Sequence, residues 1–230
     1  MGDGFLAMPS MAIKGNRVVV AVDDNYEVLE IGGRLETPHK IAQGLFEHYG
    51  TIHILDVDGY MKESPHLNFI QKACDGGELW VDAGSAIGES VIDLIMAGAT
   101  QAVICTKTIS GFREVVNAYE LSEDIVFQID YKKGVLASDK GIAKMSVDDI
   151  IDEVLDIGIT RFILADYGAM EKGTGPNVKM LKGMLEEHPK IELFAAGGIK
   201  AEQGPELKEA GLTGAIMDIR SCIKLRNISL

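Results

Sequence analysis

The sequence has few of the residues that mark secreted, metal-binding or membrane proteins. Its three cysteines, Cys74, Cys105 and Cys222, show no CxxC spacing, so we expect neither a disulfide framework nor a cysteine metal cluster, and we expect a reducing cytoplasmic setting. No apolar run approaches the ~18 residues of a membrane helix. The first residues also lack the basic start and long apolar stretch of a secretion signal.

Positive charge is also scarce. The chain carries 22 lysines and arginines against 35 aspartates and glutamates, a formal net charge of −13. A nucleic-acid-binding protein usually presents a basic face, so this class is excluded, and an acidic balance favours solubility without indicating a fold. The five histidines show no HxH or HxxxH spacing, so we expect no zinc site.

Apolar residues and glycines are abundant. Of 230 residues, 47% are hydrophobic, 6% are aromatic and 26 are glycine. Short apolar runs alternate with helix-period segments, which predicts one domain over residues 1–230 with the α/β fold of a (β/α)8 TIM barrel. Most of these runs are continuous, as buried parallel strands should be. The strands are expected near 5–12, 51–57, 79–83, 101–106, 124–130, 161–166, 191–196 and 213–218.

The two halves of the chain resemble each other. Ala83-Gly84 recurs as Ala196-Gly197 and Ala97-Gly98 recurs as Ala210-Gly211, each 113 positions later (197 − 84 and 211 − 98). Gly59 and Gly168 are separated by 109 positions (168 − 59). A repeat over half a chain predicts a two-fold barrel made of two half-barrels.

Two segments depart from the alternation of strand and helix. Residues 15–33 are predicted to form a hairpin inserted after the first strand, and residues 131–145 its counterpart after the fifth. Thr37-Pro38, Ser64-Pro65 and Ser146 are predicted to begin helices. The last helix should be short, because only 12 residues follow Asp218.

Four motifs give the chain a specific resemblance. They are LDVDG at 55–59, QID at 128–130, GTGPN at 173–177 and AAGGI at 195–199. With these motifs the chain resembles the ProFAR isomerase family of histidine biosynthesis, and in particular the relatives of that enzyme in archaea and methylotrophs. The resemblance implies a barrel with a phosphate site in each half. It also implies a reaction that opens the ring of an aminoaldose and moves a proton to give an aminoketose, with no metal or organic cofactor.

The resemblance also implies an acid and a base at the ends of strands one and five. Asp130 is the strand-five candidate, because a carboxylate at a buried strand end can have a pKa near neutrality. The strand-one position is expected at Met11, which cannot transfer a proton, and Lys14 is the next polar residue. Asp166 is the third catalytic candidate, and Ala165 replaces the threonine that usually precedes it. The unmodified histidine-pathway reaction is therefore not expected.

Glycine-rich loops supply the candidate phosphate ligands. Backbone N–H groups in such loops can approach an anion closely. They could equally be plain tight turns between strand and helix. In the second half Asp218 would repel a phosphate, whereas Arg220 could hold one. The predicted ligands are Gly84, Ser85, Thr106, Gly173, Thr174, Gly197, Gly198 and Arg220.

Aspartates are numerous at the predicted strand ends. A bound divalent cation could neutralise them, because hard cations prefer carboxylate oxygens. The alternative is that some cap helices or bind loop amides, which we expect for Asp56 and Asp58. The group comprises Asp56, Asp58, Asp82, Asp130, Asp166 and Asp218.

Three functions remain open from the sequence. The first is an isomerase acting on a phosphorylated sugar or small phosphorylated carbonyl compound. The second is a lysine-dependent lyase or condensing enzyme that uses Lys14 or Lys107 to form an imine, in the biosynthesis of one-carbon cofactors such as methanofuran or tetrahydromethanopterin. The third is a non-catalytic protein that binds a phosphate ligand. The oligomeric state does not follow from the sequence.

Overall fold

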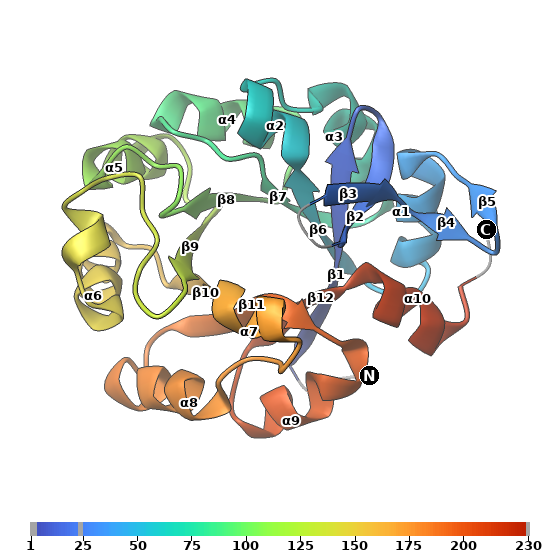
Figure 1. Ribbon diagram of the computed structural model, residues 1–230. Helices are drawn as coiled ribbons and strands as arrows, with labels where there is room; N and C mark the ends of the chain where they lie inside the picture. The colour runs from blue at the N-terminus through green and yellow to red at the C-terminus, as the bar shows by residue number, and fades with distance from the viewer. Residues whose placement is uncertain (1–3, 23–24, 229–230) are drawn as a thin grey trace.

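The computed structural model describes residues 4–22 and 25–228. Eight parallel strands form a closed ring, since the last barrel strand pairs with the first. Figure 1 shows this ring of strands with the helices outside it. The barrel strands are β1 (Leu6–Lys14), β6 (Thr51–Asp56), β7 (Glu78–Asp82), β8 (Gln101–Cys105), β9 (Ile125–Tyr131), β10 (Arg161–Asp166), β11 (Glu192–Ile199) and β12 (Gly214–Asp218).

The helices follow the strands in the order that the repeat predicts. Each half contributes four strands, and β6 and β10 are each followed by a short helix and then a longer one. The protein is therefore a (β/α)8 TIM barrel with a two-fold internal repeat, and all eight predicted strands are confirmed. The helices are α1 (Pro38–Phe46), α2 (Val57–Lys62), α3 (Leu67–Ala73), α4 (Gly88–Met96), α5 (Phe112–Leu121), α6 (Val147–Ile157), α7 (Tyr167–Lys172), α8 (Val178–Glu187), α9 (Gly204–Glu209) and α10 (Ile219–Arg226).

Two apolar layers surround the barrel wall. A smaller cluster fills the barrel interior, where the rings of Trp80 and Phe194 meet edge to face at 4.8 Å. A larger cluster, which includes Phe127 and Phe162, lies between the strands and the helices. Because successive side chains of a strand point to opposite faces, membership of a cluster shows which residues face the interior.

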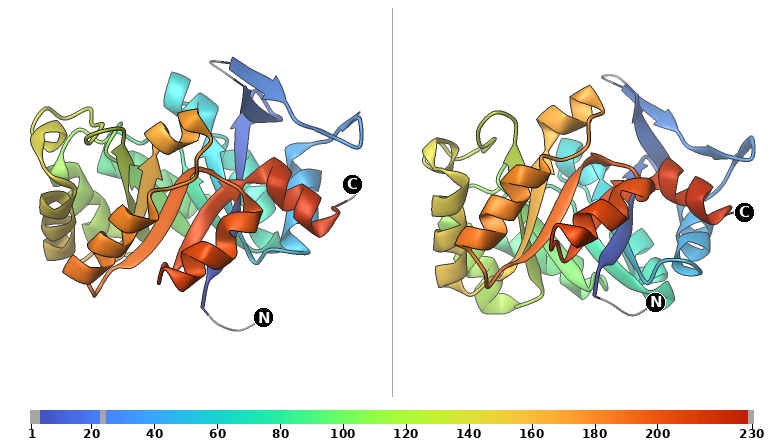
Figure 2. Two further views of the ribbon diagram at one scale, coloured as in Figure 1. Left: turned by 60° about the horizontal axis from the view of Figure 1, so that its bottom comes forward. Right: turned by 90° about the horizontal axis from the view of Figure 1, so that it is seen from below.

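One of the two predicted insertions is a hairpin. β2 (Arg17–Val22) pairs antiparallel with both β1 and β3 (Asn25–Val28), and residues 23–24 between β2 and β3 lie outside the described part of the chain. A second small hairpin joins β4 (Glu30–Ile31) to β5 (Arg34–Leu35). The β2–β3 hairpin stands at the end of the barrel opposite the start of β1, where the strands reach their carboxyl ends (Figure 2).

The other predicted insertion and one predicted cap were wrong. Residues 131–145 form a loop with a single bridge, from Tyr131 to Val135, and a 3-10 turn at Ile142–Lys144. Ser64-Pro65 does not start a helix, because α3 begins at Leu67 after His66. The caps at Thr37 and Ser146 are confirmed, the latter as a reciprocal capping box with Asp149.

Candidate active site

Three of the six strand-end aspartates begin helices. A side-chain oxygen of each accepts a backbone N–H of the first helical turn, as an N-cap residue does. Asp56 accepts from Gly59 at 3.0 Å, and Asp166 accepts from Ala169 at 2.9 Å. Asp218 accepts from Ser221 at 3.0 Å. These carboxylates therefore shape the start of α2, α7 and α10, as we expected for Asp56.

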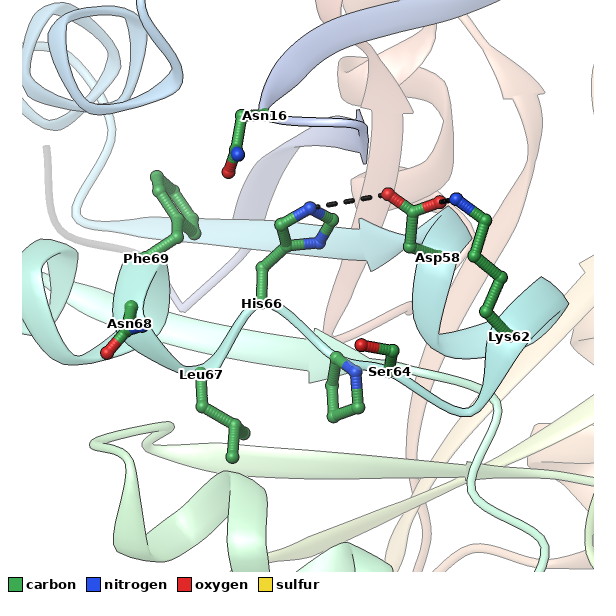
Figure 3. Close-up of a pocket in the computed structure, with 9 residues that line it drawn as sticks. Asn16, Asp58, Lys62, Ser64, His66, Leu67, Asn68 and Phe69 are labelled. Atoms are coloured by element: carbon green, nitrogen blue, oxygen red, sulfur yellow. Dashed lines mark ion pairs between the residues drawn. The ribbon is translucent and has the colours of Figure 1, made fainter.

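Asp58 is also engaged in the fold. It accepts the Gly15 amide at 2.6 Å and pairs with Lys62 at 2.8 Å. His66, which the sequence did not single out, lies between Asp56 and Asp58 with ring nitrogens 2.9 and 3.4 Å from their oxygens. Figure 3 shows His66 reaching toward Asp58 at the edge of a cavity of about 480 Å³. This cavity is lined by neither Asp82 nor Asp130.

Asp130 lies at the carboxyl end of β9 and is fully buried. Its oxygens accept the Lys107 amide at 3.0 Å and the Gln128 side-chain amide at 2.9 Å. Burial raises the pKa of Asp130 above its ordinary value, although the Lys107 amide and a hydrogen bond with Tyr167 oppose the shift. A raised pKa makes a carboxyl group a better proton acceptor and keeps it protonated to a higher pH than an ordinary aspartate, as proton transfer requires. Asp130 is thus the proton-transfer candidate that the sequence predicted.

Asp82, at the end of β7, is the second carboxyl group directed into the barrel. It is 1% exposed, and its oxygens accept the Tyr60 hydroxyl at 2.7 Å and the Gly84 amide at 3.1 Å. Burial raises the pKa of Asp82 to about 7, the Tyr60 hydrogen bond opposes the rise, and the charge of Asp130 adds to it. The sequence placed Asp82 only among the crowded aspartates. Its partner Tyr60, which lies on α2, gave no signal.

Strand one offers no carboxylate in the equivalent place, and the expected position was off by one residue. Met11 is fully buried in the outer layer between strands and helices, whereas Met8 lies in the interior cluster. Alternation therefore places Ser10, Ala12 and Lys14 on the interior face of β1.

The register identifies the counterpart of Asp130 independently. Ala12 stands beside Leu55, and Asp130 stands beside Ala165. Leu55 and Ala165 are equivalent, because each immediately precedes the aspartate that caps the next helix. Ala12, not Met11, thus occupies the place of Asp130 in the first half. It carries no proton-transfer group either.

The two lysine candidates lie at different strand ends. Lys14 is half-buried at the end of β1, with its Nζ 5.0 Å from the centre of the Tyr26 ring of the hairpin. Lys107 is exposed after β8, with its Nζ 4.3 Å from the centre of the Tyr167 ring. Its charge contributes to holding Asp130 in the ionised form. Lys107 is therefore the lysine closer to the predicted chemistry.

Cys105, at the end of β8, is held inside the same polar cluster. Its Sγ lies 2.9 Å from the Tyr60 hydroxyl and 3.0 Å from Thr108 Oγ1. Burial raises the pKa of Cys105 well above its ordinary value, and the charges of Asp82 and Asp130 add to the effect. A thiol that stays protonated is a poor nucleophile. Cys105 therefore serves packing and hydrogen bonding.

The predicted phosphate ligands of the first half lie in two places, the loop after β7 and the buried surroundings of Asp130. Gly84 has a left-handed φ of 69° and leads into Ser85, which is buried. Thr106 is fully buried, and its hydroxyl donates to the Leu136 carbonyl at 2.7 Å and accepts the Asp130 amide at 3.0 Å. The Thr106 hydroxyl therefore supports Asp130 rather than facing a ligand in this structure.

In the second half, two glycines near the end of β11 break the regular pairing with β12. The register shifts between Ala195 and Ile199, and Gly197 and Gly198 have φ values of 119° and 69°. Arg220, in the first turn of α10, pairs with Asp218 at 3.1 Å. The loop thus offers glycine amides and one cation, Arg220, which is already paired with the Asp218 carboxylate.

The GTGPN segment links two helices. Gly173 ends α7 with a left-handed φ of 61°, and Asn177 caps α8 through the Met180 amide at 3.2 Å. The Thr174 hydroxyl donates to the Gly175 carbonyl at 3.3 Å. Gly173 and Asn177 therefore have structural roles at the end of α7 and the start of α8 that need no bound ligand.

The described residues contain neither a candidate metal-binding cluster nor a candidate membrane-spanning helix. No group of three or more histidine, cysteine, aspartate or glutamate side chains within 4–22 and 25–228 is arranged to hold a metal ion. None of the helices in those ranges has the length and apolar character that crossing a membrane requires.

The closed barrel carries buried carboxyls and glycine loops at the carboxyl ends of its strands, which is the face where TIM-barrel enzymes place their active sites. The family model described as "Histidine biosynthesis protein" matches residues 7–218, and the chain belongs to this family.

The relatives found are isomerases of the histidine pathway. The chain is 27% identical over 156 residues to the ProFAR isomerase of Leuconostoc mesenteroides, covering 64% of this chain and 65% of that one. It is 25% identical over 242 residues to the enzyme of Clostridium botulinum strain Okra, covering 97% and 98%. With the Maricaulis maris enzyme it shares 23% over 225 residues, covering 92% and 91%. The protein is a ProFAR-isomerase-like barrel.

The pKa of Asp82 has a consequence for stability. An unfolded aspartate has a pKa of about 3.9, so between pH 4 and 7 the folded protein binds a proton at Asp82 that the unfolded chain does not. Stability attributable to Asp82 therefore falls as the pH rises through this window. We expect the unfolding free energy of Asp82→Asn to fall less between pH 4.5 and 7.5 than that of the wild type, by at most about 4 kcal/mol.

Urea unfolding at the two pH values measures this difference. Comparing the change in unfolding free energy between the two pH values cancels any pH-independent effect of the new amide on stability. Asp58→Asn is the matched control, because hydrogen bonds with Lys62 and the Gly15 amide lower the pKa of Asp58, and its removal leaves the slope above pH 4.5 unchanged. Equal slopes for the wild type and Asp82→Asn would show that Asp82 is ionised throughout.

Proposed function

We propose that this barrel is an aldose–ketose type isomerase that transfers a proton on a phosphorylated sugar or a small phosphorylated carbonyl compound other than ProFAR. The observation that carries the proposal is Asp130, a buried carboxyl group at the carboxyl end of β9 with a raised pKa. The family membership supports the reaction class. The alanine at position 12 argues against the unmodified histidine-pathway substrate, because the chemistry there needs a different proton donor or acceptor.

Asp130 acts in this proposal as the acid or base. Lys107 stabilises its ionised form, and Lys14 provides a further cation on the interior face of β1. Asp166 contributes by fixing the start of α7, which carries Tyr167 next to Asp130.

The phosphate of the substrate binds at the glycine loops. Gly197, Gly198 and Arg220 form the second-half site, in which the phosphate competes with Asp218 for the guanidinium group. Gly84 and Ser85 serve a second phosphate or hydroxyl group in the first half. Gly173 and Thr174 close the loop after α7 over the ligand. Backbone amides at left-handed glycines are suited to this task, because no Cβ blocks an approaching anion.

The proposed reaction needs no metal or organic cofactor, because two side chains suffice to move a proton between carbon and oxygen. Turnover should therefore persist in EDTA.

Proton exchange tests the reaction class before the substrate is known. The protein is incubated in D₂O with ProFAR, ribose 5-phosphate, glyceraldehyde 3-phosphate and ribose, and the C2 proton is followed by NMR. We expect the C2 signal of a phosphorylated compound other than ProFAR to disappear, while unphosphorylated ribose stays unchanged. Exchange of the C2 proton of ProFAR alone would instead indicate the unmodified histidine-pathway reaction.

The same incubation separates the two other functions left open by the sequence. Adding borohydride traps an imine if Lys107 or Lys14 forms one, and the mass of the labelled peptide identifies the lysine. Binding of a phosphorylated compound with neither exchange nor trapping indicates a non-catalytic binding protein.

A further inference from the structure

Two buried carboxyl groups flank one strand at the mouth of the barrel. Asp82 ends β7, Asp130 lies near the end of β9, and Cys105 ends β8 between them. The Cys105 Sγ lies 3.8 Å from Asp82 Oδ1. Asp82 and Asp130 are 1% and 0% exposed, and each influences the ionisation of its surroundings through its charge. They therefore belong to a single electrostatic cluster.

The carboxylate of Asp82 has no evident structural purpose. Asp56, Asp166 and Asp218 cap helices, but Asp82 accepts the amide of its own turn, at Gly84, the Tyr60 hydroxyl and, at 3.8 Å, the Cys105 thiol. An asparagine could keep the first two contacts without placing an ionisable group in the barrel, because its oxygen could accept the Gly84 amide and its NH2 group could donate to the Tyr60 hydroxyl. Burying a carboxyl that the fold does not need is costly, and such groups concentrate at functional sites.

We propose that Asp82 is the second proton-transfer group of this site and works with Asp130, in place of a carboxylate on strand one. This inference rests on the proposed function and deepens it. Each carboxyl has a tyrosine partner, Tyr60 for Asp82 and Tyr167 for Asp130. In the complex, hydroxyl groups of the substrate take over the hydrogen bonds that the two phenols make in the free protein.

The pair completes an isomerisation without an outside reagent. The protonated carboxyl gives its proton to the ring oxygen as the bond between that oxygen and C1 breaks, and the C1 heteroatom forms a double bond to C1. The ionised carboxyl removes the C2 proton, whose electron pair forms C1=C2 while the double-bond pair returns to the heteroatom. Transfer of the C2 hydroxyl proton to C1 then gives the ketose.

The surroundings keep one proton on the pair near neutral pH. Asp82 faces Tyr60, Cys105 and Asp130, none of which is cationic. Asp130 faces Gln128 and Tyr167 and has in addition the Lys107 amide and its positive side chain. This asymmetry favours the proton on Asp82, whose pKa is raised to about 7 chiefly by burial. Two carboxyls whose surroundings separate their pKa values are suited to act as acid and base.

Kinetics of matched variants test the role of Asp82. For the compound found in the D₂O panel, Asp82→Asn should lower kcat by about 10²–10⁴-fold. It should also remove the limb near pH 7 from the profile of kcat/KM. Asp58→Asn removes another buried carboxylate outside the cluster and should retain kcat within a few-fold. Near-normal turnover by Asp82→Asn, with Asp130→Asn inactive, would overturn this inference and leave the proposed function intact.

A titration without substrate tests the shared proton. In ¹³C NMR of the full-length protein, the Asp82 carboxyl should titrate near pH 7, and at lower pH in Asp130→Asn. An Asp82 titration near pH 4 in the wild type would overturn the inference whatever the substrate. If no phosphorylated compound exchanges its C2 proton, the proposed function fails and the catalytic role of Asp82 fails with it, even where the titration shows the shared proton.

Discussion

Replacing Asp130 with asparagine should lower kcat by about 10²–10⁴-fold while KM changes only a few-fold. Asparagine keeps an oxygen that can accept the Lys107 amide, now 3.0 Å from the carboxylate. The change therefore removes proton transfer while the local structure is largely retained. Because Asp130 acts on the transition state in this account, the loss should fall on kcat rather than on binding.

Steady-state kinetics and a thermal melt of the same preparation check this prediction. A folded Asp130→Asn protein with wild-type kcat would remove Asp130 from the chemistry. Asp149→Asn, at the exposed start of α6, is the control for loss of one negative charge and should retain full activity.

Substituting Gly197 with alanine should disrupt both the fold and the phosphate loop. An added Cβ would lie 2.5 Å from the Asp166 carbonyl oxygen and 3.0 Å from its amide nitrogen, at a φ of 119° that other residues rarely adopt. The backbone strain alone costs about 1–3 kcal/mol, and the clash adds to it. Relief of the clash moves the loop away from the capping residue of α7, so affinity for phosphate should fall as well.

Gly183→Ala is the matched control for this substitution. Gly183 lies in α8 with open space around the site of a Cβ, so alanine should stabilise the helix by about 0.5–1 kcal/mol. Urea unfolding and phosphate titration measure both variants. If Gly197→Ala were as stable as the wild type, the close approach of β11 to Asp166 would be wrong.

The fold could be predicted from the sequence because it rests on repeated, local signals. Continuous apolar strands and glycine turns recur in both halves, and all eight strands lie where these patterns predict. A Lys-Gly pair occurs near the start of both insertions, at 14–15 and at 133–134, but only residues 15–33 continue with a run of β-branched residues that can form a hairpin. Residues 131–145 lack such a run and remain a loop.

The site could be predicted only in part, because spacing does not fix which face a residue occupies. The resemblance placed the strand-one catalytic position at Met11, whereas the strand pairing places Ala12 there. A shift of one residue in a strand exchanges its two faces. The role of Asp82 could not be predicted from its position in the sequence. Its importance depends on burial and on contact with Tyr60, Cys105 and Asp130, which come from different elements.

In the proposed site, one ligand contacts both Asp130 and the Gly197–Gly198 loop. An NMR titration of the ¹⁵N- and ¹³C-labelled protein with ribose 5-phosphate tests this most directly. We expect the Gly197 and Gly198 amide signals and the Asp130 carboxyl signal to move with a single Kd, while inorganic phosphate moves the amides alone. Amide shifts with an unmoved Asp130 signal at saturating ribose 5-phosphate would contradict a shared site at the mouth of the barrel.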